Sequence, residues 1–304
     1  SPMSRGLGDV YKRQISYFTG KEDNNETFFN AKRSSNWAVV AFGMVGASLS
    51  GVTFISVPGW VGESQFTYFQ VVIGYLIGYL IVANLLLPVY YNFGLTSIYE
   101  YLNERFGKKS HLVGSISFLI SRILGASFRL YLVAIVLQEF VLDDFGIPYE
   151  ITVIISISLI WLYTRRGGIK TIVWTDTIQT TLMILAVVLS IHYINKDIGW
   201  TFVEFVGSTD FKELNQIFVT DDIMKRNYFL KSIIGGAFIT ICMTGLDQDM
   251  MQKNLTCKNL NDAKKNMIVF SFILTAVTFL FIVLGALLYI CLLYTSPSPR
   301  DIGE

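Results

Sequence analysis

Apolar residues along the chain gather into segments that are long enough, or nearly long enough, to cross a bilayer as helices. Polar connections separate the seven segments, which are 37–62, 68–91, 112–142, 151–163, 172–194, 229–251 and 267–290. The fourth is slightly short unless Tyr149 and Glu150 extend it, and the long connection 195–228 is expected to contain a surface helix. The pattern predicts an all-α integral membrane protein with about seven transmembrane helices.

The first segment is interrupted in its middle. It contains the run GASLSG at 46–51, and Pro58 and Gly59 follow near its far end, so a continuous helix is not expected. Hydrocarbon cannot satisfy the backbone groups that a break sets free, so a break requires protein, water or a bound ion beside it. Broken helices of this kind mark the binding sites of secondary transporters. The alternative is a close helix contact made by small residues.

The sixth segment repeats this feature. Its run GGAFITICMTGLDQDMMQ combines glycines with Thr240 and Thr244, and it begins on the opposite side of the membrane from the first segment. Two interrupted segments of opposite orientation, five helices apart, are what an inverted repeat of five helices produces. Lysine and arginine residues favour a cytoplasmic start for the first segment, because the short loops 63–67 and 143–148 on the other side contain none.

Composition agrees with a membrane protein. Hydrophobic residues make up 52% of the 304 positions and charged residues only 15%, and the mean hydropathy is +0.50, unlike a soluble domain. A net charge of +1 gives no reason to expect a nucleic-acid partner. The segments contain no HExxH motif, no paired aspartates and no candidate catalytic triad, so an enzyme is not expected.

Four motifs, in register along the chain, resemble the sodium:solute symporter family. They are SGVTFISVPG at 50–59, LTSIYEYLNERFG at 95–107, GGIKTIVWTDTIQ at 167–179 and TGLDQDMMQKNL at 244–255. The resemblance implies a leucine-transporter-like bundle of two inverted repeats with the first and sixth core helices broken. It also implies sodium-coupled symport of a small organic or anionic solute by alternating access.

Both ends of the chain are expected to be non-native. DNA that encodes residues 4–14, SRGLGDVYKRQ, has a reverse complement that encodes CLLYTSPSPRD, the sequence of residues 291–301. Peptides read from opposite strands of one oligonucleotide indicate translated adaptor DNA. We therefore interpret 1–14 and 291–304 as adaptor-derived, and 15–290 as a transporter-domain fragment that holds core helices one to seven. The eighth helix, which carries hydroxyl ligands for sodium in the family, is expected after residue 290.

The resemblance also implies roles for individual residues. Backbone carbonyls of Gly46 and Leu49 are expected to bind sodium, with Asp176 close to the ion. A carboxylate inside a span needs a cation, a partner or water. Two alternatives remain for Asp176. It could act as the titrating group of a proton-coupled symporter, or it could form an ion pair with one of three nearby cations, Arg165, Arg166 or Lys170.

In the family that the chain resembles, solute contacts come from the first, second, third, sixth and later core helices. By position, the residues are Thr53, Val72, Tyr75, Thr240, Met243 and Thr244. Members that carry sugars use longer amide and acid side chains at several of these places, so the same mode of sugar binding is not expected. TSIYEYLNERF looks more like the branch that carries iodide, vitamins and monocarboxylates, while an amino acid or an acidic sugar remains open.

Four charged residues in or near the spans allow a functional and a structural interpretation. Arg122 and Arg129 share one helix face, because they are seven positions apart. They could bind an anionic solute, but we favour snorkelling or a structural pair with Glu139 or Glu63. Asp247 and Asp249 lie at the end of the sixth segment, where solvated carboxylates are expected.

The remaining expectations concern location and partners. The chain is expected in a cell membrane, as a multi-pass protein of the bacterial inner membrane, with sodium as coupling ion and no other cofactor. Its partners are then the solute, sodium and the bilayer, with no obligate protein partner. A different class of function is a solute-sensing module of a membrane sensor kinase, because similar domains also occur fused ahead of histidine kinases.

Overall fold

The structure is a computed structural model, and it describes residues 33–295 except 50, 96 and 165–167. Residues 1–14 and most of 291–304, which the sequence predicts to be adaptor-derived, lie outside the described residues, as do Arg165 and Arg166.

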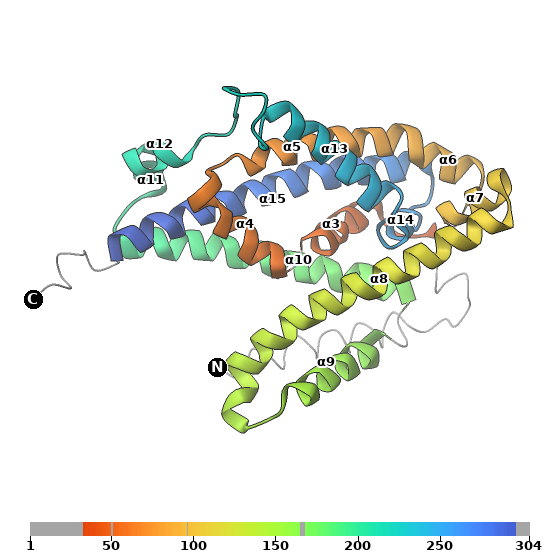
Figure 1. Cartoon of the computed structure of the whole chain (residues 1–304), viewed down its shortest axis with the longest axis horizontal. Coiled ribbons are helices and arrows are strands. Elements are labelled where there is room, and N and C mark those ends of the chain that lie inside the picture. Colours follow the sequence, from red (N-terminus) through yellow and green to blue (C-terminus); the bar gives the residue numbers. More distant parts are fainter. Residues whose placement is uncertain (1–32, 50, 96, 165–167, 296–304) are drawn as a thin grey trace, which may run out of the picture.

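All seven predicted segments are helical, and the two predicted breaks are present (Figure 1). The helices are α3 (Trp37–Ser48), α4 (Gly51–Ser64), α5 (Tyr68–Ile81), α6 (Leu87–Asn92), α7 (Ile98–Phe106), α8 (Lys108–Leu137), α9 (Tyr149–Thr164), α10 (Gly168–Ile198), α11 (Phe202–Gly207), α12 (Thr209–Leu214), α13 (Phe229–Thr240), α14 (Gln248–Asn254) and α15 (Leu260–Thr295). Short turns of π-helix at Val82–Leu86, Gln138–Leu142 and Ile241–Gly245, and a 3₁₀ turn at Asp143–Phe145, extend several of them.

Six of these spans have the length that a bilayer requires. Four are single helices, at 68–92, 108–137, 172–198 and 260–292, and two are bent pairs, among the described residues. The first pair, α3 with α4, bends by 62°, and the second, α13 with α14, bends by 71°. Helix α9 has 16 residues and falls short of the ~20 that a span normally needs. It begins at Tyr149, so the predicted extension of the fourth segment is present.

Helix α15 is the centre of the bundle. It packs against α3, α4, α5 and α10, and 56% of its most apolar stretch is buried inside the protein, against 6% for α8. In Figure 1, α8 and α9 lie side by side at the edge of the molecule, and the described parts of both present apolar side chains such as Leu124, Phe128 and Trp161 outward. Such a surface suits a hydrocarbon environment.

Glycines let α5 and α13 approach each other closely. A Cβ atom on Gly74 would lie 2.1 Å from the carbonyl oxygen of Ile233, and one on Gly236 would lie 2.2 Å from that of Val71. Gly78 faces Ala237 of α13 in the same way, at 2.5 Å. Small residues at such positions are the usual means of packing membrane helices without an intervening side chain. The contact fixes the first part of the sixth span against the second span.

Helix α10 packs on α3 through hydroxyl groups. The Thr177 hydroxyl lies 3.2 Å from the Val39 carbonyl, and the Thr180 hydroxyl lies 3.1 Å from the Phe42 carbonyl. Gly46 provides the space for this contact, since a Cβ atom there would meet the Thr180 oxygen at 2.2 Å. Hydrogen bonds between helices supplement van der Waals packing where no hydrophobic driving force exists.

The long connection 199–228 contains two short surface helices, α11 and α12, as its sequence predicts. Gln70, fully buried near the start of α5, holds the end of this connection. Its amide nitrogen donates to the Asn227 carbonyl at 3.2 Å, and its oxygen accepts from the Val219 amide at 3.2 Å. The connection is therefore fixed to the bundle.

The glycine contact gives a direct test with a neighbouring control. Gly236→Ala places a methyl group against backbone that cannot move independently, which costs about 1–3 kcal/mol for overpacking. We expect the melting temperature of the full-length protein in detergent to fall by several degrees. Gly235→Ala should leave it unchanged or raise it, because a Cβ atom at Gly235 meets nothing within 4 Å. Equal melting temperatures for the two variants would contradict the close α5–α13 contact.

Candidate functional site

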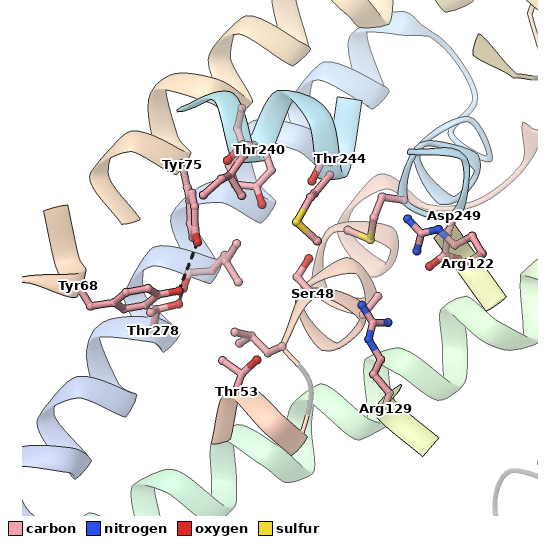
Figure 2. Close-up of a pocket in the computed structure, with 17 residues that line it drawn as sticks. Ser48, Thr53, Tyr68, Tyr75, Arg122, Arg129, Thr240, Thr244, Asp249 and Thr278 are labelled. Carbon is pink, nitrogen blue, oxygen red and sulfur yellow. Dashed lines mark hydrogen bonds between the residues drawn. The ribbon is translucent and has the colours of Figure 1, made fainter. Parts of the chain in front are cut away.

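A cavity of about 260 Å³ lies where the two broken helices meet. Its walls come from the break between α3 and α4, from α5 and α8, from the π-turn and α14 that follow α13, and from α15. Figure 2 shows side chains from these helices converging on the space. The cavity therefore depends on both interrupted segments, which lie far apart in the sequence.

The breaks leave polar backbone groups near the cavity, and the structure shows how some of them are satisfied. Leu49, in extended conformation after α3, donates its amide to the Val45 carbonyl at 2.8 Å. At the second break the Gly245 carbonyl accepts from the Tyr90 hydroxyl at 3.2 Å. The last turn of any helix leaves carbonyls without intrahelical partners, and their negative partial charge favours a cation. The carboxyl end of α3 thus offers oxygen atoms of the kind that sodium binds.

Tyrosine and threonine hydroxyls form the wall opposite α8. Tyr68 and Tyr75 lie one above the other on α5 and share a hydrogen bond of 3.3 Å between their hydroxyls (Figure 2). Thr240 is buried and donates its hydroxyl to the Gly236 carbonyl at 3.1 Å. Thr278 of α15 also lines the cavity. This wall can orient a polar solute by neutral hydrogen bonds.

Helix α8 contributes two guanidinium groups. Arg122 and Arg129 both line the cavity, and Figure 2 shows them on the side away from Tyr68 and Tyr75. Arg122 lies over the Phe118 ring, 5.3 Å from its centroid, and pairs with the buried carboxylate of Asp247. The predicted ion pair of Arg122 with an acid is therefore present, but the acid is Asp247 and not Glu139 or Glu63. Within the described part of the chain, Arg129 lines the cavity without an ion pair.

Asp247 has two functions at the second break. Its Oδ1 atom accepts from the amides of Asp249 and Met250, at 2.9 and 3.2 Å, and so caps the amino end of α14. Its Oδ2 atom pairs with Arg122. Only 6% of this side chain is exposed, so the expectation of a solvated carboxylate was wrong for Asp247. Asp249, with 53% of its side chain exposed, agrees with that expectation.

A second ion pair holds the other end of α14. The Lys253 ammonium donates to Asp176 Oδ2 at 2.9 Å, and its side chain is only 5% exposed. Asp249 Oδ1 lies 4.0 Å from the same ammonium. Asp176 therefore has a cation of α14 beside it, as well as the nearby cations that the sequence suggested, of which Arg165 and Arg166 lie outside the described residues. Helix α14 is joined to α8 at one end and to α10 at the other.

Most residues predicted to contact the solute lie together in the cavity. Five of the six line it, and these are Thr53, Tyr75, Thr240, Met243 and Thr244. Val72 does not. It occupies the same face of α5 as Tyr68 and Tyr75, but its short side chain is fully buried in the protein.

The residues predicted to bind sodium are distributed differently. Leu49 lines the cavity, whereas Gly46 and Asp176 lie behind it, at the contact of α3 with α10. A Cβ atom on Gly46 would be 2.8 Å from the Asp176 carbonyl, so the two residues are neighbours. Among the described residues, no three His, Cys, Asp or Glu side chains are grouped to hold a metal ion.

Several cavity residues were not identified from the sequence. They are Ser48, Tyr68, Tyr79, Asp249, Met250 and Thr278. Tyr68 and Tyr79 could have been found, because they lie seven positions before and four positions after Tyr75, which places all three on one face of α5. Lys253 lies just beyond the sixth predicted segment, and nothing in its local sequence points to Asp176, 77 residues away.

Comparisons with known proteins agree with this arrangement. A model of the sodium:solute symporter family matches residues 28–298. The sodium-coupled monocarboxylate transporter 1 of Mus musculus is 28% identical over 275 residues, which cover 88% of this chain and 42% of that protein. The sodium/sialic acid symporter NanT of Aliivibrio fischeri is 28% identical over 299 residues, 95% of this chain and 56% of that protein.

The fold is that of a solved transporter. A Na⁺-coupled sialic acid symporter, in a substrate-bound outward-open state, matches with a TM-score of 0.83 at 22% sequence identity, over 96% of this chain and 62% of that one. The predicted leucine-transporter-like helix bundle is thereby confirmed. These proteins are transporters rather than enzymes, in line with the sequence. The chain spans about half the length of the curated relatives it matches.

The pair between Lys253 and Asp176 yields a prediction about stability. Lys253→Met leaves a largely buried carboxylate without its cation, and breaking a buried pair in this way costs about 3–5 kcal/mol. The melting temperature of the full-length protein should fall clearly, and Asp176→Asn combined with Lys253→Met should recover most of the loss. Lys225→Met removes an ammonium from the fully exposed pair with Asp221 and should change little. A double variant no more stable than the single one would contradict this assignment.

Proposed function

Because the chain belongs to the sodium:solute symporter family, we propose that the full-length protein is a sodium-coupled symporter that carries a small carboxylate across a cell membrane by alternating access. The chain has the family's fold and the breaks of its first and sixth core helices. We assign the protein to the bacterial inner membrane as a multi-pass protein, since the match to the bacterial NanT covers 95% of the chain.

One observation supports an anionic solute above others. Arg129 extends into the cavity and, in the described part of the chain, has no ion pair of its own. A guanidinium in a membrane-embedded cavity is unfavourable unless an anion or water meets it, and its planar donors match a carboxylate in a bidentate arrangement. Relatives named for monocarboxylates and for sialic acid carry acids, which fits this choice. The hydroxyls of Tyr75, Thr240 and Thr244 would orient the rest of the solute.

Sodium acts at the carboxyl end of α3 in this proposal. The Leu49 and Gly46 carbonyls would supply oxygen atoms, and Asp176 lies next to Gly46. A hard cation requires several oxygens to replace its water, so these carbonyls form only part of a complete site. Binding at the break would stabilise the unwound backbone, and the solute would close the space between the two broken helices. Rocking of the bundle then releases both inside.

The first test measures uptake by the full-length protein in proteoliposomes. An inward sodium gradient should drive accumulation of labelled lactate or sialic acid, and a potassium gradient should not. Arg129→Gln should reduce uptake at limiting solute at least about tenfold, because a bidentate charged contact contributes about 1.5–3 kcal/mol. Sodium-driven uptake of glucose but of neither acid would refute the anionic specificity.

The position of the solute can be tested with two matched substitutions in α4. Thr53→Phe puts a ring into the cavity and should abolish uptake, since about 260 Å³ leaves no room for both ring and solute. Ile55→Phe adds a ring two residues away, where the side chain is 68% exposed on the outside of the bundle. It should retain uptake close to that of the wild type. Loss of uptake in both variants at equal expression would argue against the cavity as the solute site.

A further inference from the structure

Helix α14 is attached to the rest of the protein by one ion pair at each end. At its amino end Asp247 pairs with Arg122 of α8, and at its carboxyl end Lys253 pairs with Asp176 of α10. The helix has only seven residues and follows a bend of 71°. Neutral contacts also hold it, because Met250 and Met251 are buried and Asn254 accepts a hydrogen bond from the Asn266 amide of α15 at 2.7 Å. The two pairs are the charged part of these attachments.

Each ion pair includes one residue of the proposed solute site or sodium site. Arg122 lines the solute cavity and is one of its two guanidinium groups. Asp176 is a neighbour of Gly46 through its backbone carbonyl, and we propose the sodium site at this point of the bundle. An anion in the cavity competes with Asp247 for Arg122, and a sodium ion competes with the Lys253 ammonium for Asp176. In each case the ligand and the side chain that it displaces carry charges of the same sign. The exchange therefore leaves neither Arg122 nor Asp176 unpaired.

The groups that would be displaced have substitute partners within α14 itself. Asp247 keeps two hydrogen bonds from the amides of Asp249 and Met250, where the helix dipole also favours a negative charge. Lys253 lies 4.0 Å from Asp249, one turn earlier on the same helix. A charge that leaves its partner in a low dielectric is costly unless another partner is near. Helix α14 can detach without carrying an uncompensated charge.

We propose that α14 is the inner gate of this transporter, released only when sodium replaces Lys253 at Asp176 and the solute's anionic group replaces Asp247 at Arg122. The proposal rests on the proposed symport function. Sodium alone breaks the pair between Lys253 and Asp176, while the pair between Asp247 and Arg122 still holds the helix. The solute alone breaks the pair at Arg122, while the pair at Asp176 remains. The two attachments together make release dependent on both ligands, which is the requirement for coupled transport.

Removing one attachment at a time separates the two requirements. In proteoliposomes that contain the full-length protein, Asp247→Asn should permit sodium flux without solute, because the amide keeps the capping oxygen but loses the charge. Lys253→Met should permit solute flux without sodium. If Lys253 occupies Asp176 about nine-tenths of the time, its removal also lowers the half-saturating sodium concentration about tenfold. Lys258→Met, the same change at an exposed position just beyond α14, should alter none of these.

A second readout follows α14 directly and does not depend on transport. Cys257, three residues beyond α14, is fully buried, and burial raises the pKa of its thiol to about 12. In a variant of the full-length protein in which every cysteine except Cys257 is replaced by serine, N-ethylmaleimide should label Cys257 slowly with or without sodium. In the Asp247→Asn background, sodium alone should accelerate labelling at least about tenfold, since a released α14 exposes a thiol of ordinary pKa near 8.5. Lys253→Arg should restore the sodium requirement that Lys253→Met removes.

The outcomes distinguish the gate from the proposed function. Absence of sodium-driven carboxylate uptake in the wild type would refute the symport proposal, and the Cys257 experiment would still decide whether sodium and Asp247 control α14. The gate is refuted if both variants keep strict coupling, or if sodium fails to change Cys257 labelling in Asp247→Asn. A parallel fall of both fluxes without any leak would assign the pairs a purely structural role.

Discussion

The unsatisfied backbone at two helix breaks constrains the whole structure. Inside a membrane a freed carbonyl or amide has no water to bind, so protein or a ligand must meet it. Tyr90 does so at the Gly245 carbonyl, and Asp247 does so at the amino end of α14. At the first break Ser48 and Leu49, at the end of α3, line the cavity. The proposed binding site thus lies where regular structure stops and backbone polar groups lose their helical partners.

Close packing around the breaks keeps that site in place. Glycines bring α5 against α13, and threonine hydroxyls bring α10 against α3, so each broken helix has a continuous helix fixed to its first half. The second halves, α4 and α14, are held differently. Helix α4 packs on α15, where Gly285 faces the Pro58 carbonyl, and α14 is held by two ion pairs in addition to its buried Met250 and Met251. A contact between apolar surfaces separates gradually, whereas an ion pair can be exchanged for a ligand of the same charge.

The ion pairs also explain how charged residues are accommodated so close to the bilayer interior. Lys253 and Asp247 are almost entirely buried, and each has a partner on another helix and a second partner within α14. Such pairs contribute little net stability compared with apolar residues of the same size. They help to fix α14 in one position, and in the proposed gate they would respond to ligand charge. Arg129, without such a pair among the described residues, lines the cavity, where we propose that it binds the solute.

The sequence by itself determined the elements and most of the cavity. Apolar runs located all seven helical segments, small residues located both breaks, and the resemblance to the family pointed to Thr53, Tyr75, Thr240, Met243 and Thr244, which line one cavity. The segments and the breaks are local features, so periodicity and composition reveal them. Tertiary structure alone decided the charge partners and the exclusion of Val72. Asp176 meets a lysine 77 residues away, because helix packing sets which faces touch, and packing depends on side-chain sizes across the whole bundle.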